Sequence, residues 1–492
     1  MTTICATYSQ LNRLYLNGQW VEGQSALLNT DTNPFNGEML VQIQQATPAQ
    51  LHAAYEAAHR AQKAWAQCAH QERSSLLLRV AQVLDTRAEE IIGWIIRESG
   101  STRLKAHIEL ISAKGMVLEA ASYPSRMHGD ILAPLFPGQS SRVYREPLGV
   151  IGVISPWNFP FHLSMRSVAP ALATGNTVVL KPASDTPVSG GTLLAAIFEE
   201  AGAPAGTINV VVGAGSEIGD AFVEHPIPRL ISFTGSTPVG KGIGAKATGG
   251  HYLKRVALEL GGNAPIVVLD DADIEDAAAG AVAGRFLHQG QICMSTNRAI
   301  VDARVYEQFV AAVERRVKTL KFGDPDLIEN VIGPIINDKQ LADVQAKIAR
   351  ALQDGARLVV GGEAQSNVLP PHVLADVDPA WSIAKDETFG PVLPIICARG
   401  EAHALELANA TEFGLSSCVY TRDLERGVRF ARGIEAGMTH VNNMSVGDQP
   451  NAPFGGEKNS GLGRFNGHWI LEEFTRTHWI TVQEQGKAQY PL

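Results

Sequence analysis

Cysteine is scarce in this sequence, and no two cysteines stand close together. The five are Cys5, Cys68, Cys293, Cys397 and Cys418, and none belongs to a C-x-x-C pair. A disulfide framework and a structural zinc cluster are therefore not expected. Isolated thiols fit a reducing compartment, so the cysteine pattern predicts a cytoplasmic protein.

Long apolar runs are also missing. No uncharged apolar stretch reaches about 18 residues, the length that a membrane-spanning helix needs. Residues 1–20 lack the basic segment and the following apolar segment that mark a secretory signal peptide. The sequence predicts neither a membrane span nor an export signal.

Basic charge is not in excess either. The chain has 41 Lys and Arg against 50 Asp and Glu, a net charge of −9. This acidic balance argues against nucleic-acid binding as its main function. Of its 492 residues, 45% are hydrophobic and 18% are charged. These are ordinary values for a globular chain and exclude predominant disorder. At roughly 150 residues per domain, the length suggests about three domain equivalents.

The periodicity of apolar residues predicts an α/β fold. A short strand region is expected at 14–21, and helical periodicity runs over 47–99 and on to about 121. Pro and Gly cluster over 123–138, which marks a boundary or an excursion. Short apolar runs then alternate with helical segments, as in parallel βαβ units with buried strands. These strands are expected at 150–154, 177–180, 208–212, 230–233, 255–258 and 266–269, with helices at 189–201, 217–223 and 239–247.

A second α/β series is expected from about 273 to 441, with helices near 305–320 and 340–352. Two glycine-rich turns precede it. The turn at 213–219 has one residue too many for the dinucleotide fingerprint, so a nucleotide turn and a plain strand-to-helix turn both remain open. The turn at 235–242 resembles a P-loop, but Gly242 stands where Ser or Thr would hold magnesium, which argues against an NTPase. A strand followed by a helix N-terminus at Ser236 still suits a pyrophosphate.

A candidate nucleophile lies in the segment Gly-Gln-Ile-Cys-Met-Ser. A lone cysteine is most often an inert core residue, but the glycine and small polar neighbours of Cys293 indicate a turn that leaves the sulfur accessible. Glu259 is a carboxylate in an apolar, glycine-flanked stretch, where a charge needs a partner or a function. Asn158, in a rigid Pro-Trp-Asn-Phe-Pro loop, is either a donor to an oxyanion or a self-bonded turn residue.

Taken together, these segments resemble the aldehyde dehydrogenase superfamily over nearly the whole chain. Each motif is modest by itself, but their common order and spacing are specific. The motifs are Pro156-Trp157-Asn158-Phe159-Pro160, Lys181-Pro182-Ala183-Ser184, Phe233-Thr234-Gly235-Ser236, Glu259-Leu260-Gly261-Gly262, Gly290-Gln291-Ile292-Cys293, Glu387-Thr388-Phe389-Gly390-Pro391 and Pro453-Phe454-Gly455-Gly456.

The resemblance implies a role for each matching residue. Cys293 is the expected nucleophile, Glu259 the base that activates the hydrolytic water, and Asn158 an oxyanion donor together with the Cys293 main-chain N–H. No step requires a metal. The expected cofactor-binding residues are Ile154, Trp157, Lys181, Ser184, Gly215, Ser236, Leu260, Glu387 and Phe389.

Two positions depart from the common pattern. Many NAD-preferring members have Glu where this chain has Ser184, and that carboxylate would repel a 2′-phosphate. Serine with Lys181 nearby implies that either NAD or NADP can bind. His468 stands where some members carry a second glutamate, and it is interpreted as structural rather than as a proton relay.

The C-terminal motif region and the context of Cys293 resemble the branch that oxidises benzaldehyde, vanillin and salicylaldehyde. An apolar funnel for an aromatic aldehyde is then expected. Its lining residues are Phe159, Leu163, Ile292, Met294 and Phe454. His162 and Arg166 are four residues apart and could share one helix face. One of them could touch a ring substituent, but the favoured interpretation is that both are solvated polar residues.

The resemblance also implies the domain organisation. A Rossmann-like cofactor domain is expected over 1–121 and 146–257, and an α/β catalytic domain over 258–465. A small β oligomerisation element is expected over 122–145 and 466–492, in a homodimer or homotetramer. Two alternatives to a hydrolytic enzyme remain: a CoA-acylating dehydrogenase, which would not need Glu259, and a non-catalytic relative, which would be free to lose Cys293.

Overall fold

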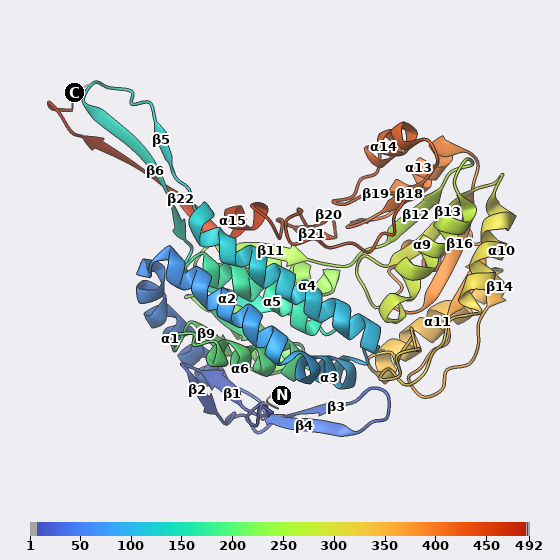
Figure 1. Cartoon of the computed structure of the whole chain (residues 1–492), viewed down its shortest axis with the longest axis horizontal. Coiled ribbons are helices and arrows are strands. Elements are labelled where there is room, and N and C mark those ends of the chain that lie inside the picture. The colour runs from blue at the N-terminus through green and yellow to red at the C-terminus, as the bar shows by residue number, and fades with distance from the viewer. Residues whose placement is uncertain (1–6, 489, 491–492) are drawn as a thin grey trace.

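Two parallel-rich sheets, each covered by helices, form the body of the molecule in the computed structural model, which describes residues 7–488 and 490 (Figure 1). Cys5 lies outside the described residues. The α/β fold class expected from the sequence is confirmed. Among the described residues, no helix combines the length and apolar character needed to cross a bilayer.

The first sheet has the strand order β2-β1-β9-β8-β7-β10-β11-β21. Its central strands, from β9 to β11, run parallel, whereas β1, β2 and β21 add antiparallel edges. Val150–Ile154 and Thr177–Lys181 are buried almost throughout, as expected for strands covered on both faces. The bounds are β1 Leu14–Leu16, β2 Gln19–Val21, β7 Val150–Ile154, β8 Thr177–Lys181, β9 Ile208–Val210, β10 Leu230–Thr234, β11 Arg255–Glu259 and β21 Gly461–Leu462.

Helices cover both faces of this sheet. They are α1 Pro48–Gln67, α2 His70–Thr86, α3 Ala88–Ser99, α4 Arg103–Ser122, α5 Pro160–Ala173, α6 Leu193–Glu200, α7 Asp220–Glu224, α8 Thr237–Gly249 and α15 Trp469–Phe474, with short turns η1 Tyr123–Arg126, η2 Val188–Thr192 and η3 Gly215–Gly219. Helix α5 is buried along its whole length, between the sheet and α4.

The helical periodicity expected from 47 to 121 is divided into four separate helices. Thr47 starts α1 with a capping box. Gly100, at φ +66°, ends α3 in the left-handed conformation, and Thr102 then caps α4. The apolar period continues across these breaks, which is why it alone does not reveal them.

The second sheet has the order β14-β15-β16-β13-β12-β18-β19, parallel except for β14. Its strands are β12 Ala264–Val268, β13 Thr296–Asp302, β14 Arg357–Val360, β15 His372–Ala375, β16 Val392–Ala398, β18 Cys418–Tyr420 and β19 His440–Val441. Its helices are α9 Ile274–Phe286, α10 Tyr306–Val317, α11 Asp338–Asp354, α12 Ser382–Lys385, α13 Glu401–Asn409 and α14 Leu424–Ala431, with η4 Leu287–Gly290. Two small ribbons complete the fold: β3 Leu28–Thr32 with β4 Met39–Gln44, and β17 Phe413–Gly414 with β20 Glu457–Lys458.

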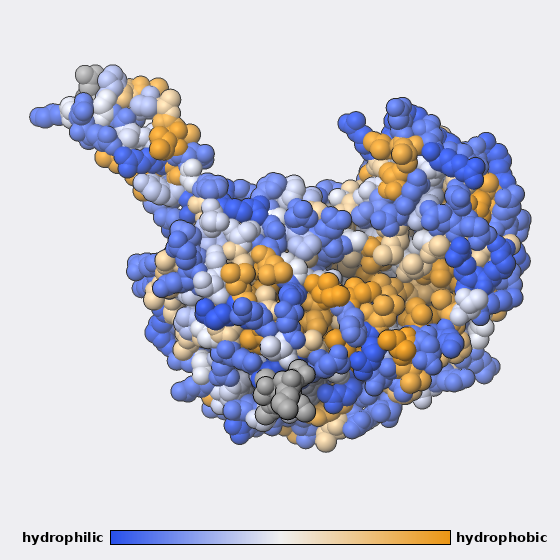
Figure 2. Space-filling model, viewed as in Figure 1, coloured by the Kyte–Doolittle hydropathy of each residue, from blue (hydrophilic) through white to orange (hydrophobic). Residues whose placement is uncertain are grey.

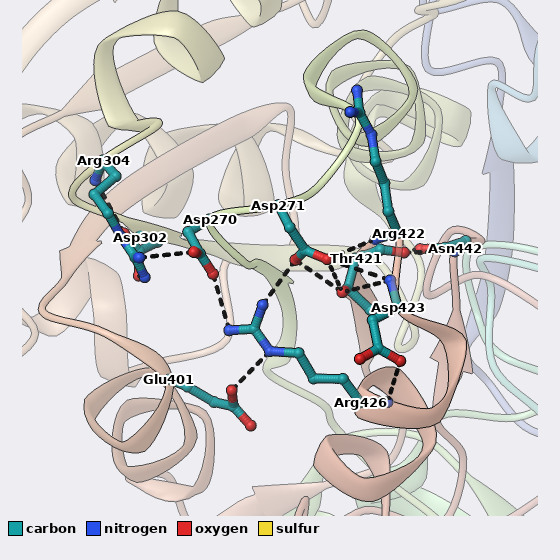
Figure 3. Close-up of polar contacts among 10 residues, drawn as sticks. All are labelled: Asp270, Asp271, Asp302, Arg304, Glu401, Thr421, Arg422, Asp423, Arg426 and Asn442. Carbon is teal, nitrogen blue, oxygen red and sulfur yellow. Dashed lines mark hydrogen bonds and ion pairs between the residues drawn. The ribbon is translucent and has the colours of Figure 1, made fainter.

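An ion-pair network lies at the carboxyl edge of the second sheet (Figure 3). Arg426 of α14 contacts Asp270 and Asp271, which follow β12, at 2.9 Å each, and Glu401 of α13 at 2.8 Å. Thr421, after β18, donates to Asp271 at 2.8 Å. The network ties two helices to two strands at the end of the sheet opposite Cys293, which precedes β13.

A three-stranded arm projects from the body (Figure 1). It consists of β5 Asp130–Leu132, β6 Gln139–Pro147 and β22 Thr475–Gln483, all antiparallel, so the excursion after α4 pairs with the C-terminal segment. The arm exposes large apolar side chains, including Ile131, Leu135 and Trp479, and Figure 2 shows hydrophobic residues on it. The domain boundaries expected from the sequence stay a prediction, as does the cytoplasmic location.

Candidate active site

The carboxyl ends of the central strands in the first sheet carry many of the residues that the sequence singles out. Ile154, Lys181 and Glu259 are the last residues of β7, β8 and β11, and Thr234 ends β10 beside Glu259. The chain order reverses between β7 and β10, because β8 and β9 extend the sheet on one side and β10 and β11 on the other. Such a reversal opens a ligand-binding crevice at the carboxyl edge of a parallel sheet.

Cys293 reaches this crevice from the second sheet, in the loop between η4 and β13. The backbone before it is left-handed at His288, Gln289 and Gly290, with φ values of 50°, 56° and 72°. For the two non-glycine residues this conformation is strained, and such strain is concentrated at functional sites. Gly262 permits the close approach of the two segments, because a Cβ there would lie 2.2 Å from the carbonyl oxygen of Cys293.

Burial is the main cause that raises the pKa of the Cys293 thiol to about 12, and the carboxylates of Glu259 and Glu387 contribute in the same direction. Burial likewise raises the pKa of Glu259 to about 7, whereas the Arg166 guanidinium works in the opposite direction. Neither carboxylate oxygen of Glu259 has a hydrogen-bond partner among the described residues. The thiol therefore needs a base to become a thiolate, and Glu259, whose charge acts on this thiol, titrates near neutrality.

Asn158 is buried near Cys293, and the two residues together line two cavities. Its Nδ2 donates to the main-chain carbonyl of Gln291 at 2.8 Å. An amide nitrogen has two donors, so this bond orients the group and leaves one N–H for an oxygen in the cavity.

The first cavity, about 270 Å³, lies at the edge of the first sheet and is called the sheet-edge cavity. Gly235 and Ser236, at the start of α8, lie in its wall, and Ser236 makes no side-chain cap bond to the helix. The first-turn N–H groups of α8 and the positive end of its dipole suit a phosphate. Trp157 and Phe389 also line this cavity and pack edge to face, with ring centres 5.4 Å apart. The residues present therefore fit a nicotinamide dinucleotide.

Glu387 and Phe389 belong to a loop that a buried arginine holds in place. Arg285, fully buried on α9, donates to the carbonyls of Thr388 and Gly390. Glu387 Oε1 accepts the N–H of Gly262 at 2.8 Å, and burial raises the pKa of Glu387 to about 7. Leu260 lines the same cavity.

Four of the expected cofactor residues lie at the same sheet edge, outside the lining of the sheet-edge cavity. Ile154 and Lys181 are register partners at the ends of β7 and β8. Lys181 Nζ donates only to the Pro182 carbonyl, at 3.3 Å, in the part of the chain that the structure describes, and burial lowers its pKa to about 8. Ser184 is exposed, and Gly215 opens η3, where a Cβ would meet open space.

The second cavity, also about 270 Å³, lies between α4, α5 and residues 444–454, and is called the α4–α5 cavity. It shares Cys293, Asn158 and Leu163 with the sheet-edge cavity. All the side chains expected to line a substrate funnel are in its wall: Phe159, Leu163, Ile292, Met294 and Phe454. Helix α4 exposes Leu104, Ile108, Ile111 and Leu118. Figure 2 shows hydrophobic residues gathered in the middle of the face that it draws.

The favoured interpretation of His162 and Arg166 as solvated residues is wrong. Both are buried in the wall of the α4–α5 cavity. His162 Nε2 lies 3.0 Å from Asp448 Oδ2, and the Arg166 guanidinium lies 3.8 Å from Asp448 and 3.9 Å from Glu259. The reason is that α5 is covered on every side, so a polar side chain on any of its faces needs a protein partner.

The family model described as "Aldehyde dehydrogenase family" matches residues 20–480. A vanillin dehydrogenase of Corynebacterium glutamicum is 53% identical over 95% of this chain and 97% of its own. A benzaldehyde dehydrogenase of Bacillus subtilis is 48% identical over 98% of this chain and 99% of its own. The crystal structure of an NAD-dependent benzaldehyde dehydrogenase from C. glutamicum superposes with a TM-score of 0.90 at 49% identity. The match covers 98% of this chain and 99% of that one. This chain belongs to the aldehyde dehydrogenase family.

It is an NAD(P)-dependent aldehyde dehydrogenase, as the resemblance implied. Within the described residues of this family member, no cluster of His, Cys, Asp and Glu is arranged to hold a metal ion. His468 is exposed at the start of α15 and stacks on Trp469, with ring centres 3.8 Å apart. Its interpretation as structural stays a prediction.

Sequence reasoning missed three residues of α11 that line the sheet-edge cavity: Gln340, Asp343 and Lys347. Lys347 donates to the carbonyl of Glu387 at 2.8 Å and pairs with Asp343 at 3.0 Å. These residues recur at intervals of three and four, so they share one face of the helix. That spacing was visible in the sequence, but a charged helix face is ordinarily solvated, and only the fold brings this one to the dinucleotide crevice.

Proposed function

We propose that this enzyme oxidises an aromatic aldehyde to its carboxylic acid, with NAD or NADP, through a thioester on Cys293. One observation carries the proposal: Cys293 lies where the sheet-edge cavity meets the apolar α4–α5 cavity. A single sulfur is thereby accessible from a site that suits a dinucleotide and from a site that suits an aromatic ring.

The residues act in sequence. The Cys293 thiol gives up its proton to a nearby base, and the resulting thiolate attacks the aldehyde carbon. The free N–H of the Asn158 amide and the main-chain N–H of Cys293 stabilise the oxygen as it becomes negative. When bound, the dinucleotide supplies the acceptor for the hydride that leaves this carbon. The carbon is then a thioester of Cys293.

Hydrolysis of the thioester is assigned to Glu259. With a pKa of about 7, its carboxyl group is substantially ionised at neutral pH and basic enough to take a proton from water. A CoA-acylating enzyme would not need this base. A non-catalytic relative would be free to lose Cys293, Asn158 and Glu259, and this chain keeps all three.

An aromatic substrate is supported by the walls of the α4–α5 cavity and by the names of the relatives. The wall residues Phe159 and Phe454 offer ring faces, and Leu163, Ile292 and Met294 offer further apolar surface. Relatives that match along nearly all of the chain are named vanillin and benzaldehyde dehydrogenases.

The test is the absorbance of NAD(P)H formed with benzaldehyde and with hexanal, with and without added CoA. Benzaldehyde should give the higher kcat/KM, and CoA should not accelerate turnover. Cys293→Ala should abolish turnover and keep dinucleotide binding. Turnover by Cys293→Ala would contradict the covalent mechanism, and a preference for hexanal would contradict the aromatic substrate.

The range of cofactors is proposed to include both NAD and NADP because Ser184 carries no charge. A carboxylate there would repel a 2′-phosphate, and about 1.4 kcal/mol of repulsion is a tenfold change in affinity. Ser184→Glu should therefore lower kcat/KM for NADP much more than for NAD. An equal effect on both cofactors, or a wild-type enzyme that ignores NADP, would show that position 184 does not contact the ribose.

A homodimer or homotetramer is also proposed, with the arm as its contact surface. β22 is nine residues long and lies at the edge of the three-stranded sheet, so its outer hydrogen-bonding groups are available to another strand. The exposed Ile131, Leu135 and Trp479 would be covered in the assembly.

A further inference from the structure

Helix α4 packs against α5 and presents two charged side chains that are completely buried. Lys105 and Glu109 are one helical turn apart, and each is 0% exposed. Lys105 Nζ lies 2.5 Å from Glu109 Oε2 and donates to the main-chain carbonyl of Asn158 at 2.6 Å. It also lies 4.0 Å from the centre of the Phe159 ring. Burial disfavours the charged form of Lys105 and lowers its pKa. An ion pair removed from water in this way is weak support for stability, so another role is worth seeking.

The second oxygen of Glu109 binds the start of α5. Its Oε1 accepts the main-chain N–H groups of Phe161 at 2.9 Å and of His162 at 3.1 Å. First-turn N–H groups are ordinarily accepted by the side chain of the N-cap residue. Here the N-cap is Phe159, whose ring lines the α4–α5 cavity and has no acceptor. Because an aromatic wall residue occupies the N-cap position, the cap comes from another helix.

The pair therefore fixes the backbone on both sides of the N-cap. Lys105 holds the carbonyl of Asn158, and Glu109 holds the N–H groups three and four residues further on, in the first turn of α5. None of the polar atoms of this pair is among the unpartnered buried atoms of the described residues, in contrast to the nearby Arg166 and Glu259. Neither Lys105 nor Glu109 lines the sheet-edge cavity or the α4–α5 cavity.

We propose that Lys105 and Glu109 are positioning residues of the reaction. They hold the main chain over 158–162 so that the amide of Asn158 is aimed at the oxygen of the aldehyde bound to Cys293. The proposal rests on the proposed function, in particular on Asn158 as the oxyanion donor. Since a misplacement of about 1 Å costs roughly 100-fold in rate, fixing this loop has a direct kinetic consequence.

The experiment is a double-mutant cycle on the full-length enzyme. Single-turnover formation of NADH is measured with benzaldehyde for the wild type, Lys105→Met, Asn158→Ala and the double variant. Asn158→Ala should slow the reaction by roughly 10²- to 10³-fold, and Lys105→Met by about 10- to 100-fold. In the Asn158→Ala background, Lys105→Met should cost no more than about threefold, because the group that it positions is gone. The affinity for NAD should change less than about threefold in all variants.

A matched control tests for a merely structural role. Arg73 is buried and holds the other end of α5, donating to the carbonyl of Ala173 at 3.0 Å. Arg73→Met should lower Tm without slowing NADH formation per folded active site. Lys105→Arg, which keeps the cation, should recover at least part of the rate. If Lys105→Met does not fold, Glu109→Gln, which keeps the side-chain size, is put through the same cycle.

Three results would overturn the proposal. The first is an unchanged rate in Lys105→Met or its substitute, and the second is the same loss of rate in both backgrounds, which would show an effect independent of Asn158. The third, wild-type turnover by Asn158→Ala, would also remove the oxyanion assignment in the proposed function. The first two results leave that assignment standing, so the two failures are distinguishable.

Discussion

At the scale of single residues, two charged side chains, Glu259 and Arg166, lie close together in the interior without hydrogen bonds. The carboxylate of Glu259 and the guanidinium of Arg166 are both buried, 3.9 Å apart, and neither makes a hydrogen bond within the described residues. Arg166 lies instead between the rings of Phe454 and Phe465, 4.4 and 4.7 Å from their centres. Burial and an adjacent cation set the basicity of Glu259 in opposite directions, which keeps it near the pH at which a general base works best.

Glu259→Gln should raise Tm at pH 8. The folded pKa of Glu259 is about 7 against an ordinary 4.5, so between these values the native state binds more protons than the unfolded state. The free energy of unfolding then falls as pH rises, by roughly 3 kcal/mol at completion. Melting curves at pH 5 and pH 8 check this. Glu425 is exposed, so Glu425→Gln is a control that should leave Tm unchanged at both pH values. A variant less stable than the wild type at pH 8 would contradict it.

Arg166→Met should move the pH profile of turnover to higher pH. The guanidinium lowers the pKa of Glu259, so its removal leaves the carboxyl protonated over more of the neutral range. At pH 7, turnover should fall by up to about tenfold for each unit that the pKa rises. The steady-state rate from pH 6 to pH 9 is the measurement, and Arg166→Lys should stay near the wild-type midpoint. An unchanged midpoint in Arg166→Met would remove Arg166 from the control of this base.

The sequence predicted Cys293, Glu259 and Asn158 because each stands in a short motif whose glycines or prolines fix a turn. It did not predict that Arg166 joins them. The partner of His162 and Arg166 is Asp448, 286 residues after His162, and no local pattern marks such a contact. The available signal was the position of α5 in the sequence between two buried strands, because a polar residue on a helix that is covered on all sides does not reach water.

At the scale of elements, the strands were predicted better than the helices. The strand expected at 150–154 is β7 residue for residue, and β8 to β11 begin and end within two residues of expectation. The single strand region expected at 14–21 is two strands, β1 and β2, and β21 was not expected. A buried parallel strand is a short apolar run with sharp ends. The helical series 47–121 was harder, because α1 to α4 keep their apolar faces toward one core and the period continues through the breaks.

Arg426→Met should destabilise the second sheet and leave catalysis intact. Its guanidinium contacts three carboxylates and is mostly buried, so a loss of about 1–3 kcal/mol in the free energy of unfolding is expected. β13 separates this network from Cys293 by seven residues, about 20 Å. Melting temperature and kcat are the readouts. Arg422→Met is the matched control, because Arg422 joins the network through its main-chain N–H while its side chain points away (Figure 3).

A second readout follows from the acidic members of the network. Hydrogen bonds from Thr421 and Asp423 and the charge of Arg426 outweigh burial and lower the pKa of Asp271. A lowered carboxyl pKa contributes stability that is present above the unfolded pKa and is lost as pH falls through the folded one. The stability difference between Arg426→Met and the wild type should therefore shrink on acidification. A difference that stays constant with pH, or a kcat that falls with Tm, would contradict this account.

At the scale of the whole molecule, the arm joins segments that are more than 300 residues apart in the chain. β6 and β22 pair in an unbroken register from Gln139 with Gln483 to Pro147 with Thr475. The sequence marked an excursion near 123–138 through its Pro and Gly, but a pairing at this separation has no local signature. The expectation of a β element here came from the family resemblance.

Ile131→Asp combined with Trp479→Ser should reduce the oligomer toward single chains. The two side chains are 88% and 65% exposed on the arm, so a single chain gains nothing from their apolar surface. Light scattering after size exclusion, with the wild type alongside, measures the mass of the assembly. A matched control is Leu424→Asp on α14, an apolar residue 64% exposed and remote from the arm. A wild-type enzyme with the mass of one chain would contradict the proposed assembly outright.

The meeting of the two cavities at Cys293 has a consequence for the order of release. Apart from Cys293, Asn158 and Leu163, the two cavities have no lining residue in common. The sheet-edge cavity is lined by the ends of β7, β10 and β11, by α11 and by the Glu387 loop, whereas the other cavity is lined mainly by α4, α5 and residues 444–454. Two molecules can thus arrive at one atom from separate directions. The acid can depart along the route by which the aldehyde entered while the reduced dinucleotide is still in place. The dissociation rate of each product, and not obstruction by the other, then decides which of the two leaves first.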